Sequence, residues 1–250
     1  MKRFALIQAD NRFTADPLIR PLECAEADGV ALAGLLRHRA GFDEVVTLLA
    51  RDDRFILNTA AELCAPLGLG DLFVFIAATH GVQQGQRLLL LTSHARYAEV
   101  EFFRDVVPVD LLKQRTSRPG LQRLFILDVC RSPLLTSRRE AGQRVFQGVG
   151  ALARDVATGP APGATPAPLT ILCSCDEGRQ ALEQPKLGRG LFSLALEQEI
   201  EAALARGVEL RVADESKRKR RDRMARLAAD AGLPPNQSPW LQSNDVDEIQ

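Results

Sequence analysis

The stretch LFVFIAATHG, residues 72–81, carries the strongest indication of fold class in this chain. From Leu72 to Ala78 it is apolar without interruption. Such a run is typical of a strand that is covered on both faces, as in the parallel sheets of α/β proteins. The run then gives way to Thr79 and His80. We therefore predict a central buried strand with a polar site at its carboxyl end.

A second stretch, LQRLFILDVCRS at residues 121–132, repeats this arrangement. An apolar strand from Leu121 to Val129 leads into Cys130. Because sites in open α/β sheets form at the carboxyl ends of strands, His80 and Cys130 can converge although they are far apart in sequence. Their chemistry suits this pairing, since a thiolate attacks a carbonyl carbon while an imidazole holds or delivers a proton. The two residues are therefore a candidate catalytic dyad.

Strands and helices are expected to alternate along the rest of the chain. Further strands are predicted at residues 3–9, 44–49 and 169–174, with a hairpin segment at 88–91. Helices are predicted at residues 21–38, 58–67 (with a start as early as Asp53), 108–115, 191–206 and 214–231. Pro, Ala and Gly at residues 159–168 predict a flexible loop, and the prolines after residue 233 predict an extended tail. This order predicts an α/β fold with a doubly wound, mostly parallel sheet.

The composition argues against several classes of protein. The 32 basic and 32 acidic residues balance, which disfavours nucleic acid or an anionic membrane as a general partner. The basic run at residues 216–226 has acids on both sides, and we interpret it as a solvated helix face. No apolar run is long enough for a signal-peptide core or a membrane span. The five cysteines are irregularly spaced and indicate neither a disulfide framework nor a metal site, so we expect a soluble, cytoplasmic protein.

The two strand ends resemble the catalytic segments of a known superfamily. ATHG (residues 78–81) and DVCRS (residues 128–132) are similar to the strand–His-Gly and strand–Asp-x-Cys segments, about 50 residues apart, of caspases, metacaspases and bacterial caspase-like proteins. Three further segments agree in order: PLECAEADGVALAGLL (21–36) with the first helix, CDEGRQALE (175–183) with the stretch that closes the substrate groove, and GRGLFSLAL (188–196) with the start of a late helix. The resemblance covers roughly residues 3–210 and implies a caspase-like three-layer sandwich.

The resemblance also implies roles for individual residues. Cys130 would be the nucleophile of a cysteine endopeptidase that works through a thioester, and His80 would be its general acid and base. The backbone N–H groups of Gly81 and Cys130 would form the oxyanion hole. A residue without Cβ at position 81 lets the backbone approach the reacting carbonyl group closely. No cofactor is implied.

Acidic residues suggest which substrates such an enzyme would cleave. Asp128 stands two residues before the cysteine, as in metacaspases, and Asp28 matches a second acidic pocket residue of that branch. Two carboxylates in a small pocket favour Arg or Lys at P1, the residue before the cleaved bond, and repel Asp. Asp176 could line the same groove. Alternatively, Asp28 is a surface acid of its helix and Asp128 only hydrogen-bonds the sheet edge.

The resemblance predicts one peptidase domain over residues 1–250. It divides into a part like the large caspase subunit (1–131), a flexible loop (132–168) and a part like the small subunit (169–250). Arginines in or near the loop are candidate sites of self-cleavage: Arg138, Arg139, Arg144 and Arg154. We expect a monomer that acts on protein or peptide substrates, with a role in regulated bacterial cell death or anti-phage defence.

Departures from the family and two rival interpretations stay open. Residues 82–98 contain no acid, so the activating calcium cluster of many metacaspases is not implied. One rival is a catalytically silent caspase-like module that binds a partner; the intact His80 and Cys130 pair argues against it. The other is a flavodoxin-like small-molecule domain or a different cysteine hydrolase. Against the flavodoxin-like domain, residues 9–12 (ADNR) lack the glycines of a phosphate loop.

Overall fold

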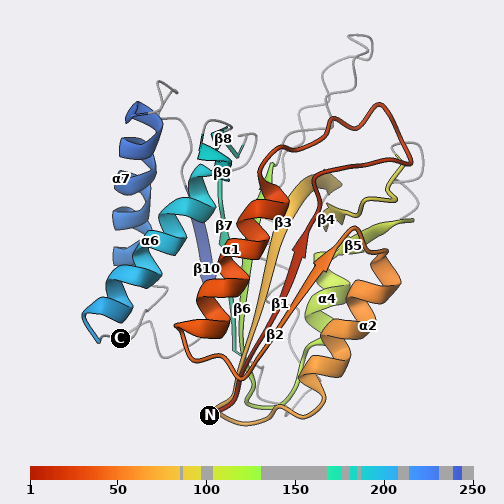
Figure 1. Ribbon diagram of the computed structural model, residues 1–250. Helices are drawn as coiled ribbons and strands as arrows, with labels where there is room; N and C mark the ends of the chain where they lie inside the picture. Colours follow the sequence, from red (N-terminus) through yellow and green to blue (C-terminus); the bar gives the residue numbers. More distant parts are fainter. Residues whose placement is uncertain are drawn as a thin grey trace.

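The computed structural model describes residues 1–84, 87–96, 104–130, 168–175, 181–184, 187–207, 214–230 and 239–243. Within these residues the main sheet has eight strands, six of which lie side by side in the order β10-β7-β6-β3-β1-β2 (Figure 1). These six are β1 (Arg3–Ala9), β2 (Glu44–Leu49), β3 (Leu72–Gln84), β6 (Gln122–Cys130), β7 (Leu169–Cys173) and β10 (Trp240–Ser243). The pairings from β2 to β7 are parallel, and β10 runs antiparallel to β7 at one edge.

Shorter strands and five described helices complete the fold. Residues 81–84 of β3 pair antiparallel with β4 (Arg87–Leu91), which in turn pairs with β5 (Val106–Pro108). A separate two-stranded sheet consists of β8 (Glu183–Gln184) and β9 (Arg189–Gly190). The helices are α1 (Ala25–His38), α2 (Asp53–Cys64), α4 (Val109–Arg115), α6 (Leu191–Ala205) and α7 (Asp214–Asp230).

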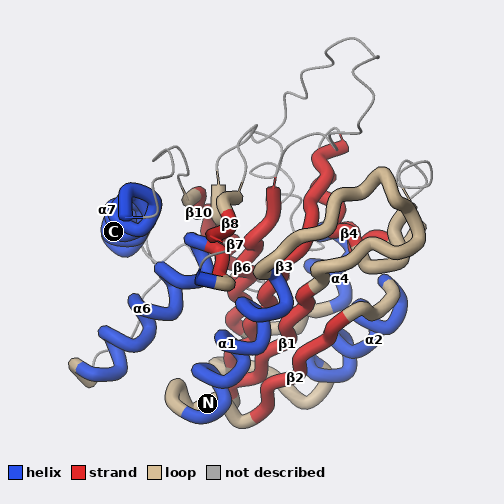
Figure 2. Tube along the Cα trace, turned by 45° about the horizontal axis from the view of Figure 1, so that its top comes forward, coloured by secondary structure: helices blue, strands red, loops and turns tan. Residues whose placement is uncertain are grey.

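Both faces of the central strands are buried, and alternate side chains serve the two faces. Phe73 and Phe75 of β3 pack in one apolar cluster with α2 and α4, whereas Val74 and Ile76 pack in another with α1, α6 and Met224 of α7. Figure 2 shows α1 and α6 on one side of the strands and α2 and α4 on the other. This arrangement explains the continuous apolar runs of the sequence, and it confirms the predicted mostly parallel sheet between helices.

Helix α1 begins at Ala25, four residues later than the predicted start at Pro21. The preceding N–H groups have partners outside the helix. The N–H of Leu22 donates to the carbonyl oxygen of Asn11, and those of Glu23 and Cys24 donate to the carboxylate of Glu183. The start of the helix is therefore set by a carboxylate 159 residues further along the chain, which local sequence does not reveal.

One strand is longer than predicted, and one strand was not predicted. β3 continues past the apolar run to Gln84, because its last residues pair with β4 after β6 has ended. The predicted extended tail contains β10, a strand that the sequence analysis did not predict, which forms a ladder with β7 over residues 240–243. This pairing joins segments that are far apart in the sequence, and the prolines nearby did not indicate it.

The early start that the sequence allowed for helix α2 is confirmed. Helix α2 begins at Asp53, where the side chain of Asp52 caps it by accepting the N–H of Phe55 at 2.7 Å. In the part of the chain that the structure describes, no helix is long and apolar enough to cross a membrane. The predicted loop lies outside the described residues except for Pro168, as do Asp176 and the arginines proposed for self-cleavage.

Candidate active site

Strand register brings His80 and Cys130 to the same level of the sheet. They are Cα partners in the parallel ladder of β3 and β6, and they form its last pair. We expected both residues just beyond the strand ends, but each still belongs to its strand. The next residue, Gly81, already pairs with Leu90 of β4, so β3 leaves β6 at this point. Neighbouring strands lie about 4.8 Å apart, which puts the two backbones within side-chain reach. Of Cys130 the structure describes the backbone.

The imidazole of His80 is oriented by a backbone oxygen. Its Nε2 lies 2.7 Å from the carbonyl oxygen of Arg20, and the ring centroid of Phe13 lies 4.9 Å from that of the imidazole. A carbonyl oxygen only accepts hydrogen bonds, so Nε2 carries the proton and Nδ1 keeps its lone pair. Sequence reasoning missed both contacts, because any residue can supply a carbonyl group and Phe13 lies in a segment without periodicity.

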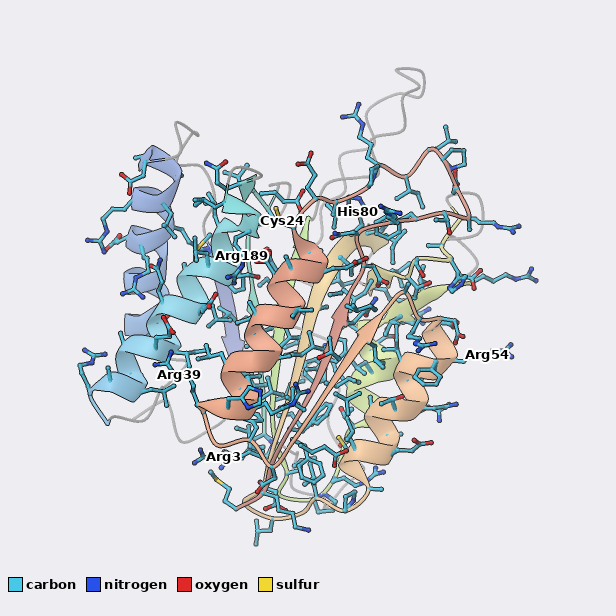
Figure 3. All side chains as sticks on the ribbon, in the orientation of Figure 1. Arg3, Cys24, Arg39, Arg54, His80 and Arg189 are labelled. Atoms are coloured by element: carbon cyan, nitrogen blue, oxygen red, sulfur yellow. The ribbon has the colours of Figure 1, made fainter. Side chains whose placement is uncertain are left out.

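Burial keeps this imidazole neutral. It lowers the pKa of His80 below the ordinary 6.5, although the Arg20 carbonyl group and the charge of Glu183 act in the opposite direction. At neutral pH Nδ1 is therefore a free base. Figure 3 shows that His80, Cys24 and Arg189 lie toward the same end of the sheet, away from Arg3.

Asp28 of α1 and Asp128 of β6 come together at Gly190. A Cβ atom built on Gly190 would lie 2.7 Å from Asp28 Oδ2 and 3.3 Å from Asp128 Oδ2, so a side chain here would force the carboxylates to shift. The N–H of Gly190 donates to Asp28 Oδ2 at 2.8 Å, and the hydroxyl of Ser193 donates to Asp128 Oδ2 at 2.7 Å. The structure thus brings together the two carboxylates that the sequence analysis paired.

This acidic pair is electrostatically strained. Burial, and next the nearby charge of Asp128, raise the pKa of Asp28 to about 7, although hydrogen bonds from Arg189 and Gly190 oppose the rise. Burial also raises the pKa of Asp128, against the hydrogen bonds from Ser193 and Ser174. Asp28 is almost fully buried, whereas Asp128 is only partly buried. A cation placed between the carboxylates would relieve their repulsion.

Sequence reasoning missed two charged residues of this region. Glu183 fastens β8 to the start of α1, because its carboxylate accepts the N–H groups of Glu23 and Cys24 at 2.8–3.1 Å. Arg189 donates from Nε to Asp28 Oδ1 at 2.6 Å and also forms an ion pair with Glu197 of α6. Their only signal was their place in segments that resemble the substrate groove of caspases.

The other cysteines do not compete for the role of nucleophile. Cys24, Cys64 and Cys173 are buried, as predicted. Burial, aided by nearby acids, raises the pKa of the Cys24 thiol to about 11, and burial raises that of Cys64 to about 12. Thiols with such values are inert at neutral pH. Among the described residues, no group of three or more His, Cys, Asp or Glu side chains is arranged to hold a metal ion.

Comparison with solved structures identifies the fold. The chain is similar to protein GSU0716 from Geobacter sulfurreducens, with a TM-score of 0.64 and 18% identity, covering 100% of this chain and 97% of that one. It is also similar to caspase-1 from Spodoptera frugiperda, with a TM-score of 0.61 and 15% identity, covering 96% of this chain and 86% of that one. No protein-family model and no curated protein matches by sequence. With its mostly parallel sheet between two layers of helices, this chain has a caspase-like fold.

Proposed function

We propose that this chain is a cysteine endopeptidase that cleaves after arginine or lysine, with Cys130 as nucleophile and His80 as general acid and base. The observation that carries the proposal is the strand register, which makes His80 and Cys130 the last pair of the β3–β6 ladder. The Arg20 carbonyl group supplies a third member that orients the imidazole. A nucleophile, a base and an orienting group are the parts that covalent catalysis by a thiol requires.

In the proposed reaction, Nδ1 of His80 accepts the proton of the Cys130 thiol, and the thiolate adds to the scissile carbonyl carbon. Backbone N–H groups of Gly81 and Cys130 hold the oxyanion that forms. The tetrahedral intermediate then collapses and the C–N bond breaks, while His80 gives the proton to the leaving amine. A water molecule that loses its proton to His80 hydrolyses the remaining thioester and restores the thiol.

The acidic pair supports a basic residue at P1. A guanidinium or ammonium group would offset the repulsion between Asp28 and Asp128, whereas a substrate aspartate would add a third negative charge. Asp128 is partly exposed, so it can contact a P1 side chain without rearrangement, whereas Asp28 already holds Arg189 and the N–H of Gly190. Asp176 remains part of the proposed groove from the resemblance alone.

Hydrolysis of fluorogenic tetrapeptides with Arg, Lys, Asp or Ala at P1 tests the proposal. We expect cleavage after Arg and Lys, and a loss of about a thousandfold or more in kcat in Cys130→Ala. Asp128→Asn should lower kcat/KM for the Arg peptide by roughly tenfold to a hundredfold and affect the Ala peptide far less. Cleavage after Asp would refute the acidic pocket. Equal rates in Cys130→Ala would refute the nucleophile, and a folded wild type inactive on every peptide would favour the silent interaction module.

The caspase-like fold is consistent with a protein or peptide substrate. From the composition we also infer a cytoplasmic location, and from the resemblance a monomer that needs no cofactor and acts in regulated bacterial cell death or anti-phage defence. Plaque counts on a bacterial host that expresses the wild type or Cys130→Ala test this role. Protection by the wild type alone would support it, and equal plaque counts would count against it.

A further inference from the structure

The pocket proposed for the basic side chain of a substrate already contains a basic side chain of the protein, that of Arg189. The guanidinium of Arg189 donates to Asp28 Oδ1 at 2.6 Å, and the backbone N–H of the next residue, Gly190, donates to Asp28 Oδ2 at 2.8 Å. The side chains of Arg189 and Asp28 are only 17% and 3% exposed. This ion pair is therefore sheltered from water and stronger than an ordinary surface pair.

Arg189 has a second anionic partner on a different helix. Its Nη2 forms an ion pair with Glu197 of α6, while its Nε contacts Asp28 of α1. Glu197 is more exposed than Asp28, at 22% against 3%. The arginine can therefore give up Asp28 and keep a charged partner, which lowers the cost of its displacement.

The segment that carries Arg189 is a small unit apart from the main sheet. β8 and β9 have two residues each and pair only with each other among the described strands. Polar contacts fasten both strands to the start of α1: Glu183 accepts the N–H groups of Glu23 and Cys24 just before the helix, and Arg189 with Gly190 holds Asp28 in its first turn. Such contacts can exchange for equivalent contacts with a ligand more readily than a packed apolar core can rearrange.

We propose that Arg189 is a displaceable internal guanidinium that closes the acidic pocket, and that a basic P1 side chain binds by taking its place on Asp28. This inference rests on the proposed function and adds a residue that determines affinity for the substrate. Four anionic groups face the region: Asp28, Asp128, Glu183 and Glu197. Among the described residues, Arg189 is the cation that forms ion pairs with Asp28 and Glu197, so a substrate cation competes with it for Asp28.

The test compares Arg189→Met with Arg39→Met. Arg39 also joins the end of α1 to α6 through an ion pair, with Glu201, but its side chain is 52% exposed and it lies well away from Arg189 in Figure 3. Peptides with Arg or neutral citrulline at P1 are compared. In Arg189→Met, the KM for the Arg peptide relative to the citrulline peptide should fall about tenfold, and agmatine should inhibit about tenfold more strongly. Arg39→Met should change neither value, and Arg189→Lys, which keeps a cation that holds a carboxylate less well, should lower the KM ratio by less than Arg189→Met does.

A purely structural role of Arg189 predicts a different outcome. If Arg189 merely supports the pocket, Arg189→Met will lose activity on both peptides, and added agmatine will restore activity rather than inhibit it. That result, or an unchanged KM ratio, overturns the inference. Thermal melting of each variant shows whether a loss of activity comes from unfolding. If Arg189→Met unfolds, Arg189→Lys decides the question, because lysine holds Asp28 more weakly and the KM ratio should still fall.

Binding separates this inference from the proposed function. In the Cys130→Ala background, calorimetry measures the Kd of a P1-Arg peptide with and without Arg189→Met. Tighter binding in the double variant supports displacement even if the wild type proves to hydrolyse nothing, which would defeat the peptidase proposal alone. If the peptide binds Cys130→Ala equally well with and without Arg189→Met, or binds neither, the displacement of Arg189 is overturned, whether or not the wild type is a peptidase.

Discussion

At the scale of the residue, His80 takes its orientation from a backbone oxygen rather than from a side chain. The Arg20 carbonyl group fixes Nε2 as the donor, and burial keeps the ring neutral. The segment that carries Arg20 is in turn held by Glu183, through the N–H groups of Glu23 and Cys24. The geometry of the candidate base therefore depends on a carboxylate far along the chain.

Glu183→Gln is expected to shift the acid limb of the pH profile of kcat/KM to lower pH. The charge of Glu183 raises the pKa of His80, so its removal lowers this pKa further and the imidazole stays neutral in more acidic solution. Glutamine keeps an oxygen that can accept the N–H of Cys24. Peptidase assays between about pH 5 and 8 measure the shift. Glu201→Gln, which removes an exposed acid of α6, is the control, and a shift to higher pH would contradict the assignment.

At the scale of the element, the contact between α1 and β1 depends on a glycine. A Cβ atom on Gly29 would lie 2.7 Å from Ala9 Cβ and 3.4 Å from Ile7 Cγ2, both on β1. Gly34, in the same helix, has nothing within 4 Å of its Cβ position. Helix α1, which carries Asp28, therefore lies in close contact with β1 at Gly29, whereas there is free space at Gly34.

Gly29→Ala should destabilise the protein by about 1–2 kcal/mol, because overpacking against β1 outweighs the better helix propensity of alanine. Gly34→Ala should stabilise it by about 0.5–1 kcal/mol, since the gain in propensity meets no obstruction. Urea denaturation of both variants measures the two changes in the free energy of unfolding. Stabilisation of similar size in both would show that α1 does not pack on β1 as described.

The sequence could predict the elements whose cause is local. Apolar runs predicted β1 and β2 to the residue, and the two strand ends selected His80 and Cys130. It could not predict the late start of α1 or the strand β10, since their partners, Glu183 and β7, are distant in the chain. The Arg20 carbonyl group and the ion pair of Arg189 escaped for the same reason. The catalytic roles themselves stay predictions.

At the scale of the whole molecule, the side chains of Asp10 and Gln8 connect the end of β1 with the residue that follows β2 and with the end of β4. Its carboxylate accepts the N–H of Ala50 at 3.0 Å and a hydrogen bond at 2.9 Å from Gln8, whose amide also donates to the carbonyl oxygen of Leu91. Burial raises the pKa of Asp10 to about 6, although these hydrogen bonds oppose the rise. The folded protein therefore favours the protonated carboxyl group more than the unfolded chain does.

This raised pKa has a consequence for stability. The protonated carboxyl group of Asp10 adds to the free energy of unfolding. This contribution is complete below pH 3.8, the pKa in the unfolded chain, and is lost as the pH rises through about 6. The free energy of unfolding should fall over this range by up to about 3 kcal/mol on account of Asp10. Asp10→Asn should flatten that part of the profile, and Asp16→Asn, the control at a half-buried acid in the loop that follows, should not flatten it. A wild-type profile that rises steadily from pH 4 to 6, unchanged in Asp10→Asn, would rule out this role.

The most direct test of the central claim is the reaction of the folded chain with a peptidyl-arginyl chloromethyl ketone, followed by intact-mass analysis and peptide mapping. The thiolate displaces chloride, so each adduct marks an activated cysteine. We predict one rapid adduct on Cys130, slowed at least about a hundredfold in His80→Ala, and none on buried Cys24 or Cys64. An unmodified Cys130, or label spread over the other cysteines of a folded protein, would contradict the assignment of Cys130 and His80.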